Sequence, residues 1–234
     1  MPDLPEPIFP VHRRVRFSSR KAAERASSFK YWLNSSMTAY SSLRFCDLGI
    51  AISNRYTIQN IVASAALGRE LDLTYLVTSM EGAEYDPAVF PGLVYRVKEP
   101  KAASLLFRSG KLVCTGAKNR EQVTKAVELV VDAIRNAGVP VKDYPQITVQ
   151  NIVASADLGS PVNLSSTVIS LGLEKVEYEP EVFPGLVYRL DNPKVVMLLF
   201  GSGRLVCTGA KKPSDVEKAI DHIEAELRAS DLLR

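Results

Sequence analysis

The residues most able to do chemistry are few and scattered in this sequence of 234 residues. The two histidines, His12 and His222, are far apart, and neither belongs to a His-Glu-x-x-His motif. The three cysteines contain no Cys-x-x-Cys pair, and an odd number argues against a disulfide framework and fits a reducing compartment. We therefore expect neither a metal site nor a cofactor.

Catalytic motifs are missing as well. The sequence contains no nucleophile elbow, no P-loop and no dinucleotide-binding fingerprint. Segments 109–111 and 158–161 are single-glycine turns rather than phosphate cradles. We therefore expect no catalytic residues and no enzymatic activity. No run of about 18 apolar residues is present, so a membrane-spanning helix is not expected either.

The sequence is internally duplicated. The segment QNIVASA at 59–65 recurs at 150–156, and residues 90–118 match residues 183–211 at 21 of 29 positions. The offset grows from 91 to 93, which predicts a two-residue insertion before Glu177. Two units of about 90 residues are too few and too long for a solenoid. We expect a pseudo-twofold pair of α+β units.

Each unit has the same expected order of elements. In the first, residues 58–65 form a strand and residues 72–80 a short helix. Short strands follow near 83–86, 92–98, 103–108 and 111–116, separated by turn dipeptides. A long helix capped by Asn119 and Gln122 closes the unit. Its apolar stripe is Val123, Val127, Val130, Val131 and Ile134. The matching helix begins at Pro213, with the stripe Val216, Ile220, Ile223 and Leu227.

The later strands are uncharged on both faces. Side chains alternate between faces along a strand, and in residues 105–107 and 112–115 neither face carries a charge. One face can pack beneath the long helices, whereas no helix remains to cover the other, which indicates a binding surface. The alternative is a sheet buried on both sides, covered by residues 1–56 or by a second copy of the chain.

The segments QNIVASA, EYDPAVFPGLVYR and LLFRSGKLVCTGAK, with their second copies, resemble the TATA-binding protein family over about residues 57–230. The resemblance implies a saddle: a curved ten-stranded antiparallel sheet of two pseudo-twofold repeats, 57–144 and 145–234, with helices on the convex side. The near-identity of the repeats is closer to archaeal than to eukaryotic members. An archaeal protein would lie on the nucleoid in the cytoplasm, and a eukaryotic one in the nucleus.

The implied function is that of a general transcription factor. It would bind double-stranded DNA at an A·T-rich TATA element in the minor groove, kink it and nucleate the RNA polymerase pre-initiation complex. The alternative is a saddle-like structural or substrate-binding module that hides its apolar sheet face by dimerisation.

The resemblance assigns DNA intercalation to four phenylalanines, spaced 17 residues apart within each repeat: Phe90, Phe107, Phe183 and Phe200. A flat apolar ring can enter a partly unstacked base step and kink the duplex. The kink of about 80° is a value that belongs to the family itself. The alternative is four core aromatics at equivalent positions of a duplicated domain.

Minor-groove contacts are implied for polar groups in the middle of the concave face: Asn60, Thr115, Asn151 and Thr208. Asparagine amides and threonine hydroxyls can donate to adenine N3 and thymine O2. The apolar contacts beside them would be Val62, Leu105, Val113, Val153, Leu198 and Val206. A guanine amine would lie unpartnered against this surface, which favours A·T pairs. Alternatively, the asparagines are strand-end or bulge residues and the threonines ordinary strand residues.

Phosphate contacts are implied for six basic residues at strand ends: Arg96, Lys111, Lys118, Arg189, Arg204 and Lys211. Ser109 and Ser202 could add hydroxyl contacts. Residues 57–234 carry a net charge of −2, so this cluster is local. Phosphate contacts set register and salt dependence rather than sequence choice. The alternative is a set of solvated strand ends.

Two nearly identical halves reading a degenerate groove discriminate poorly between the two orientations of a site. Promoter polarity is therefore expected from a partner, which the resemblance names as the B-type general transcription factor. Its contact would be the second stirrup, defined as residues 179–182, through Glu179, Glu181 and Val182. The first stirrup is residues 86–89. An ordinary acidic loop is the alternative.

Residues 1–56 lie outside the resemblance and carry nine Lys and Arg against four Asp and Glu. They could be a flexible basic arm, an upstream sequence with the true start nearer Met37, or a leader segment. We expect a disordered extension or a mis-assigned start.

Overall fold

The computed structural model describes residues 55–172 and 174–233, so the expectations for residues 1–54 lie outside the described residues. The first repeat contains β1 (Tyr56–Ala66), α2 (Leu73–Ser79), β2 (Ala83–Glu84), β3 (Gly92–Val97), β4 (Ala102–Phe107), β5 (Lys111–Ala117) and α3 (Arg120–Asn136). The second contains β6 (Thr148–Asp157), α4 (Leu164–Leu171), β7 (Val176–Glu177), β8 (Gly185–Asp191), β9 (Lys194–Phe200), β10 (Arg204–Ala210) and α5 (Pro213–Ala229).

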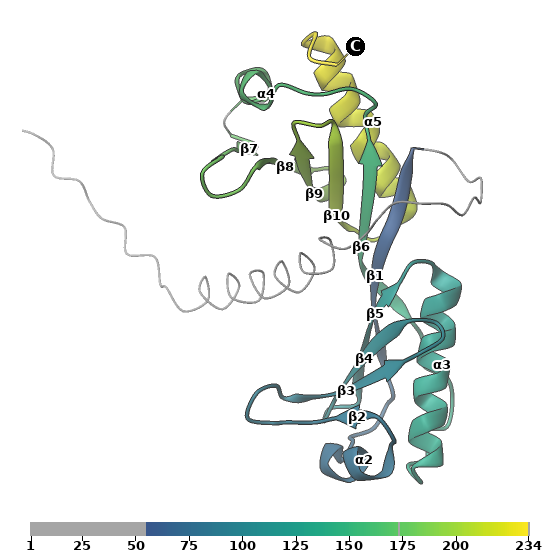
Figure 1. Ribbon diagram of the computed structural model, residues 1–234. Coiled ribbons are helices and arrows are strands. Elements are labelled where there is room, and N and C mark those ends of the chain that lie inside the picture. The colour runs from purple at the N-terminus through teal and green to yellow at the C-terminus, as the bar shows by residue number, and fades with distance from the viewer. Residues whose placement is uncertain (1–54, 173, 234) are drawn as a thin grey trace, which may run out of the picture. The chain divides into compact units, whose positions relative to one another are not determined.

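All ten strands form one antiparallel sheet in the order β2-β3-β4-β5-β1-β6-β10-β9-β8-β7. The strand order is symmetric: each strand of the first repeat lies as far from one edge as its counterpart in the second repeat lies from the other edge. The repeats meet at the centre, where β1 pairs with β6. The helices α3 and α5 lie on one side of the curved sheet, and the loops before β3 and β8 project on the other (Figure 1). The predicted fold class, two pseudo-twofold α+β repeats in one curved ten-stranded sheet, is confirmed.

The sheet is fully buried only on its helix side. In β4 the residues alternate between buried and half-buried, with Leu106 at 0% exposure and its neighbours Leu105 and Phe107 half-buried. The predicted stripes of α3 and α5 are buried throughout. One core therefore lies between the sheet and the two long helices.

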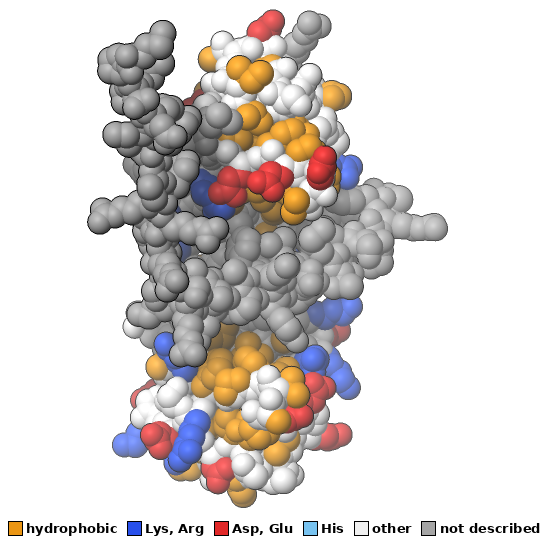
Figure 2. Space-filling model, turned by 90° about the vertical axis from the view of Figure 1, so that its left-hand side faces the viewer, with side chains coloured by type: hydrophobic (Ala, Val, Ile, Leu, Met, Phe, Trp, Pro, Cys, Tyr) orange, Lys and Arg blue, Asp and Glu red, His pale blue; other side chains and the backbone are white. Residues whose placement is uncertain are grey.

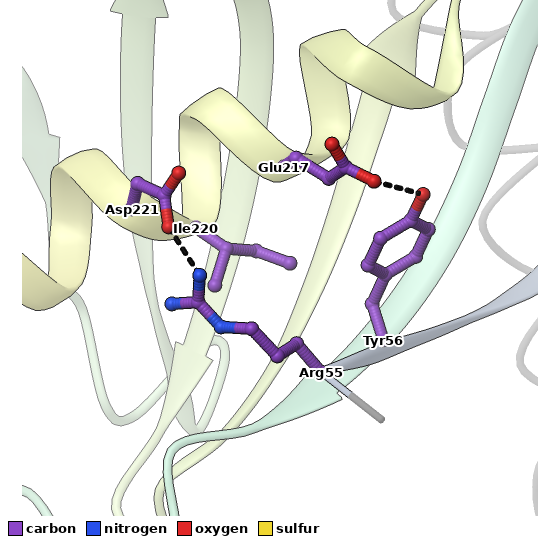
Figure 3. Close-up of a pocket in the computed structure, with 5 residues that line it drawn as sticks. All are labelled: Arg55, Tyr56, Glu217, Ile220 and Asp221. Atoms are coloured by element: carbon purple, nitrogen blue, oxygen red, sulfur yellow. Dashed lines mark hydrogen bonds and ion pairs between the residues drawn. The ribbon is translucent and has the colours of Figure 1, made fainter. Parts of the chain in front are cut away.

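A clamp at the start of β1 holds the first repeat against the last helix of the second. Tyr56 donates its hydroxyl hydrogen to Glu217 Oε1 at 3.2 Å, and Arg55 pairs with Asp221 and with Glu224, the latter at 2.7 Å. Figure 3 shows the side chains of Tyr56, at the start of β1, and of Arg55, just before it, reaching toward α5. The two repeats are thus tied together on the helix side as well as through the sheet.

Local signals explain where the elements begin and end. Asn119 Oδ1 accepts the N–H of Gln122 at 2.8 Å and starts α3, as predicted. The Gln122 side chain accepts from Lys118 N rather than from the cap residue itself. The predicted strand 83–86 is only two residues long, because the chain turns at Asp86, whose carbonyl accepts the N–H of Phe90 at 2.9 Å. The predicted insertion lies in the longer α4 and the connection after it.

Two adjacent leucines of β4 test the one-sided core. Leu106→Ala should lower the free energy of unfolding by about 2–5 kcal/mol, because it opens a cavity beneath α3. Leu105→Ala, on the other face, should cost about 1 kcal/mol, since its side chain is only partly removed from water. Urea unfolding of both variants measures the difference. Equal costs would mean that the sheet has a core on both faces.

Candidate nucleic-acid interface

The sheet face opposite α3 and α5 is apolar and only half-buried. Its strands contribute half-buried Leu105, Val113, Leu198 and Val206, each next to a fully buried neighbour on the helix side. Figure 2 looks onto this face, and hydrophobic side chains gather in two groups, one over each repeat. We call this surface the concave face.

Phenylalanine pairs stand near the two outer ends of the concave face. Phe90 and Phe107 have ring centroids 5.9 Å apart at an interplanar angle of 65°. Phe183 and Phe200 repeat this arrangement at 5.8 Å and 64°. Edge-to-face packing fixes each ring against its partner. All four rings are half-buried rather than part of the core.

Glycine is required beneath each pair. A Cβ on Gly92 would lie 2.6 Å from Phe90 Cε1, and one on Gly185 would lie 2.6 Å from Phe183 Cε1. These are the glycines of the repeated Phe-Pro-Gly sequence. The ring of the phenylalanine therefore folds back over the strand that it precedes, and only a residue without a side chain leaves room for it.

The central asparagines sit at β-bulges. The register between β1 and β5 slips at Gly116, which has a φ of +102°. A bulge leaves a backbone group without its ladder partner. Here Asn60 Oδ1 accepts the N–H of Gly116 at 2.7 Å, and Asn151 Oδ1 accepts that of Gly209, also at 2.7 Å. The asparagine side chains thus replace missing ladder bonds.

This bond fixes which way each amide points. A backbone N–H can only donate, so the oxygen of Asn60 must face Gly116 and the NH₂ group must face away. One amide hydrogen reaches Thr115 Oγ1 at 3.1 Å; in the second repeat Asn151 Nδ2 lies 3.3 Å from Thr208 Oγ1. Each threonine hydroxyl also lies within hydrogen-bond distance of Oδ1 of the same asparagine, at 3.3 Å for Thr115 and 3.5 Å for Thr208, so the second amide hydrogen of each asparagine is the donor that these bonds leave unused. The two repeats therefore place one row of amide and hydroxyl groups, which we call the donor row, across β5, β1, β6 and β10.

Basic side chains occupy the strand ends as predicted, but three of the six face acids. Arg96 pairs with Glu84 at 2.6 Å and Arg189 with Glu177 at 3.2 Å. Arg204 Nε lies 3.7 Å from a carboxylate oxygen of Asp157. Exposed pairs of this kind are worth at most about 1 kcal/mol, so a phosphate can displace the carboxylate. The other three are exposed and have no ion pair among residues 55–172 and 174–233: Lys111, Lys118 and Lys211.

The sequence matches the family described as "Transcription factor TFIID (or TATA-binding protein, TBP)" over residues 55–137 and 146–229. The chain belongs to the TATA-binding protein family. It is 59% identical to TATA-box-binding protein 1 of Haloferax volcanii over 176 residues, which are 75% of this chain and 93% of that protein.

Other relatives agree with this family assignment. The TATA-box-binding protein of Archaeoglobus fulgidus is 54% identical, over 75% of this chain and 96% of that protein. The solved structure of Methanococcus jannaschii TBP matches with a TM-score of 0.69 and 47% identity, covering 75% of this chain and 99% of that one. The resemblance to archaeal members of the family is confirmed.

Not every residue assigned from the family pattern is equally accessible. Val62 is half-buried, but its counterpart Val153 is only 6% exposed. Val153 pairs with Asn60 on one side and with Thr208 on the other, so it lies at the centre of the sheet. Val153 therefore lies in the same row, between Asn60 and Thr208 on the same face of the sheet, and its neighbours leave little of its side chain exposed.

The family pattern did not single out two glutamine–serine bonds between the repeats. Gln59 Nε2 donates to Ser155 Oγ and Gln150 Nε2 donates to Ser64 Oγ, both at 2.7 Å. Each glutamine is the extra residue at a register slip between β1 and β6. The identical recurrence of Gln59 and Gln150 in QNIVASA was the only signal that could have indicated them.

The residues of the second stirrup are all exposed: Glu179, Glu181 and Val182. Of the two predicted hydroxyl contacts, Ser109 is exposed, and Ser202 Oγ accepts the N–H of Arg204 at 3.5 Å. These positions leave the predicted contacts with a partner protein and with phosphates geometrically open.

The two cysteines of the described region are not nucleophiles. Cys114 and Cys207 occupy equivalent buried positions in β5 and β10. Burial, together with the charge of Asp215, raises the pKa of the Cys207 thiol to about 12, so the thiolate is not populated at neutral pH. Within residues 55–172 and 174–233, no group of His, Cys, Asp and Glu side chains has the arrangement of a metal site. No helix in the same residues is long and apolar enough to cross a membrane.

Two glycines of the second repeat test the support of the phenylalanine pair. Gly185→Ala should push the Phe183 ring off its strand and shift the aromatic proton resonances of Phe183 and Phe200, because the new Cβ meets the ring at 2.6 Å. Gly201→Ala is the control, since its nearest heavy atom, Val162 O, is 3.7 Å away. NMR spectra of both variants supply the measurement, and an unchanged ring pair in Gly185→Ala would contradict this packing.

Proposed function

We propose that the protein is a general transcription factor that binds A·T-rich TATA elements through the minor groove and bends them. One observation carries the proposal: an apolar sheet face with a symmetric row of hydrogen-bond donors at its centre and a phenylalanine pair near each end. The related proteins named TATA-box-binding protein support the same function.

Donors in the centre fit the chemistry of A·T pairs. In the minor groove both A·T and T·A expose only acceptors, adenine N3 and thymine O2. The amide hydrogens of Asn60 and Asn151 and the hydroxyls of Thr115 and Thr208 supply donors to them. A G·C pair would place its exocyclic amine, a donor, against these donors and against Val62 and its apolar neighbours. That amine would lose water without gaining a partner.

The phenylalanine pairs would act as wedges. Each pair presents half-buried rings on the concave face, close to one end of the donor row. Insertion of an apolar ring between base pairs costs a few kcal/mol of unstacking, which the larger contact with a bent duplex offsets. Two pairs in pseudo-twofold positions would produce one kink at each end of the bound site.

The basic residues would hold the phosphates beside the groove. Neutralising several phosphates releases counterions, which makes the affinity fall with salt concentration. Arg96 and Arg189 would exchange Glu84 and Glu177 for phosphates, whereas Lys111, Lys118 and Lys211 need no exchange.

We further propose that a B-type general transcription factor contacts Glu179, Glu181 and Val182 and that RNA polymerase joins through this complex. The division into an extension of residues 1–56 and repeats 57–144 and 145–234 is part of the same proposal. So are the absence of catalysis and a location on the nucleoid.

Energy transfer across an end-labelled A·T-rich duplex tests the bending. Adding the protein should shorten the end-to-end distance, and Phe200→Ala should remove much of this change while leaving the protein folded. Tyr144→Ala is the control, because this exposed tyrosine lies on the helix side of the sheet, where its hydroxyl donates a hydrogen bond to Asp132 on α3. It should bend DNA like the unmodified protein. Absence of bending at low salt, or an obligate dimer whose sedimentation ignores the duplex, would contradict the proposed function.

The Asn60→Asp variant tests the role of the amide donor in DNA binding while keeping the hydrogen bond that supports the bulge. An aspartate oxygen can still accept the N–H of Gly116, so the bulge should survive. The carboxylate has no hydrogen to donate and repels groove acceptors, so affinity for an A·T duplex should fall about tenfold to a hundredfold. Asn119→Asp is the matched control at the helix cap, where aspartate serves equally well. Fluorescence anisotropy measures both, and equal affinities would exclude Asn60 from the contact.

A further inference from the structure

The turns that follow β4 and β9 have the same backbone bonds in the two repeats. We call residues 107–111 the first turn and residues 200–204 the second turn. The N–H of the fourth residue donates to the carbonyl of the first, at 2.8 Å in the first turn and 2.9 Å in the second. The carbonyl of the second residue accepts an N–H from the loop after β1 or β6, at 2.9 Å and 3.1 Å respectively. Side chains at matching positions therefore leave the two turns from equivalent backbone sites.

Arg108 is a cation that the second turn lacks. It directly follows Phe107, it is exposed, and within residues 55–172 and 174–233 it has no ion pair. Gly201 occupies the matching position of the second turn. The loop that bonds to the first turn adds Arg69 and Glu70, whose charges cancel. The difference between the turns therefore stays at one positive charge from this position alone.

The last residue of each turn is also basic, but its neighbour in the sheet differs. Lys111 pairs with Ala66, which carries no charge. Arg204 pairs with Asp157, and its Nε lies 3.7 Å from a carboxylate oxygen of that residue. The first turn thus presents two cations with no acid beside them, whereas the second presents one cation beside one acid.

We propose that Arg108, together with Lys111, binds DNA phosphates at a site that the second repeat lacks, so that the first-repeat end of the sheet holds the duplex more firmly. This inference rests on the proposed function, since it takes the concave face to be the DNA-binding surface. Both cations belong to the turn that starts at Phe107, so they would bind the backbone next to the kink. An arginine guanidinium can donate two parallel hydrogen bonds to one phosphate, which makes position 108 the stronger of the two contacts.

Unequal ends give the protein a preferred orientation that does not depend on reading bases. The minor-groove pattern of A·T and T·A pairs is degenerate, so contacts at the centre of the face distinguish poorly between the two orientations. The negative potential of the groove varies along DNA and is strongest where the groove is narrow. The first-repeat end should therefore lie over the more negative half of a site.

The dependence of affinity on salt tests the additional contact. Arg108→Ala in the full chain should make the slope of log affinity against log salt shallower by about 1, because one phosphate contact and its released counterion are lost. Gly201→Arg should make it steeper by about 1. The second turn can accept this arginine, since a Cβ at Gly201 has Val162 O as its nearest heavy atom, at 3.7 Å. Fluorescence anisotropy with an A·T-rich duplex measures both slopes.

Arg228→Ala is the matched control. It removes the same charge from an exposed arginine of α5, on the helix side of the sheet, and should leave the slope unchanged. An equal effect of Arg108→Ala and Arg228→Ala would mean that only the total charge of the protein matters, which would overturn the inference. So would an Arg108→Ala slope equal to that of the unmodified protein.

A palindromic A·T-rich duplex with neutral methylphosphonate linkages in one half tests the orientation. A photoreactive amino acid in place of Ser109, in the first turn, should crosslink to the charged half about fivefold more often than to the neutral half. Adding Gly201→Arg should reduce this preference, because the two turns then carry more similar charges. Crosslinks divided equally between the halves in the protein without this graft would overturn the inference.

Energy transfer across an end-labelled duplex without neutral linkages is recorded for each variant. A protein that bends this duplex but shows no slope change and no orientation preference contradicts the inference alone. A protein that neither binds nor bends it contradicts the proposed function itself, so the two failures are distinguishable.

Discussion

The pairing of β1 with β6 is the interaction on which the rest of the structure depends. It joins two α+β repeats, each with its own long helix, into a single ten-stranded sheet. Without it each repeat would expose a central strand as an edge. With it, Asn60 and Asn151 lie on neighbouring strands and the phenylalanine pairs lie toward opposite ends. The pairing of β1 with β6, which we call the seam, therefore sets the distances between the asparagines and between the phenylalanine pairs on the concave face.

Bulges in β5 and β10, the strands next to β1 and β6, explain why polar groups can lie at the centre of an otherwise apolar face. Asparagine amides would be costly there without partners. The bulges at Gly116 and Gly209 supply those partners, because each leaves one backbone N–H for an asparagine oxygen. The same bond leaves the NH₂ groups oriented away from the backbone. The bulges thus provide hydrogen-bond donors for the asparagine Oδ1 atoms and fix the orientation of the asparagine NH₂ groups.

The sequence predicts the repeats, the helix stripes and the apolar face, because each follows from periodicity or from direct repetition. The Phe-Pro-Gly segments and the paired asparagines are recognisable for the same reason. It does not predict the bond between Gln59 and Ser155, which joins residues 96 positions apart at a register slip. Nor does it predict the pairing of Arg96 with Glu84 or the burial of Val153, since both depend on how neighbouring strands align.

The seam has a mechanical consequence. If the sheet bends a duplex as proposed, the elastic resistance of that duplex loads the sheet across its strands. In an antiparallel pair the hydrogen bonds lie perpendicular to the strands. A load across the strands is therefore carried by the hydrogen bonds between β1 and β6. The glutamine–serine bonds on one face and the Arg55–Asp221 clamp on the other brace the joint from both sides. The joint that would bear such a load is therefore held by side-chain contacts as well as by backbone pairing.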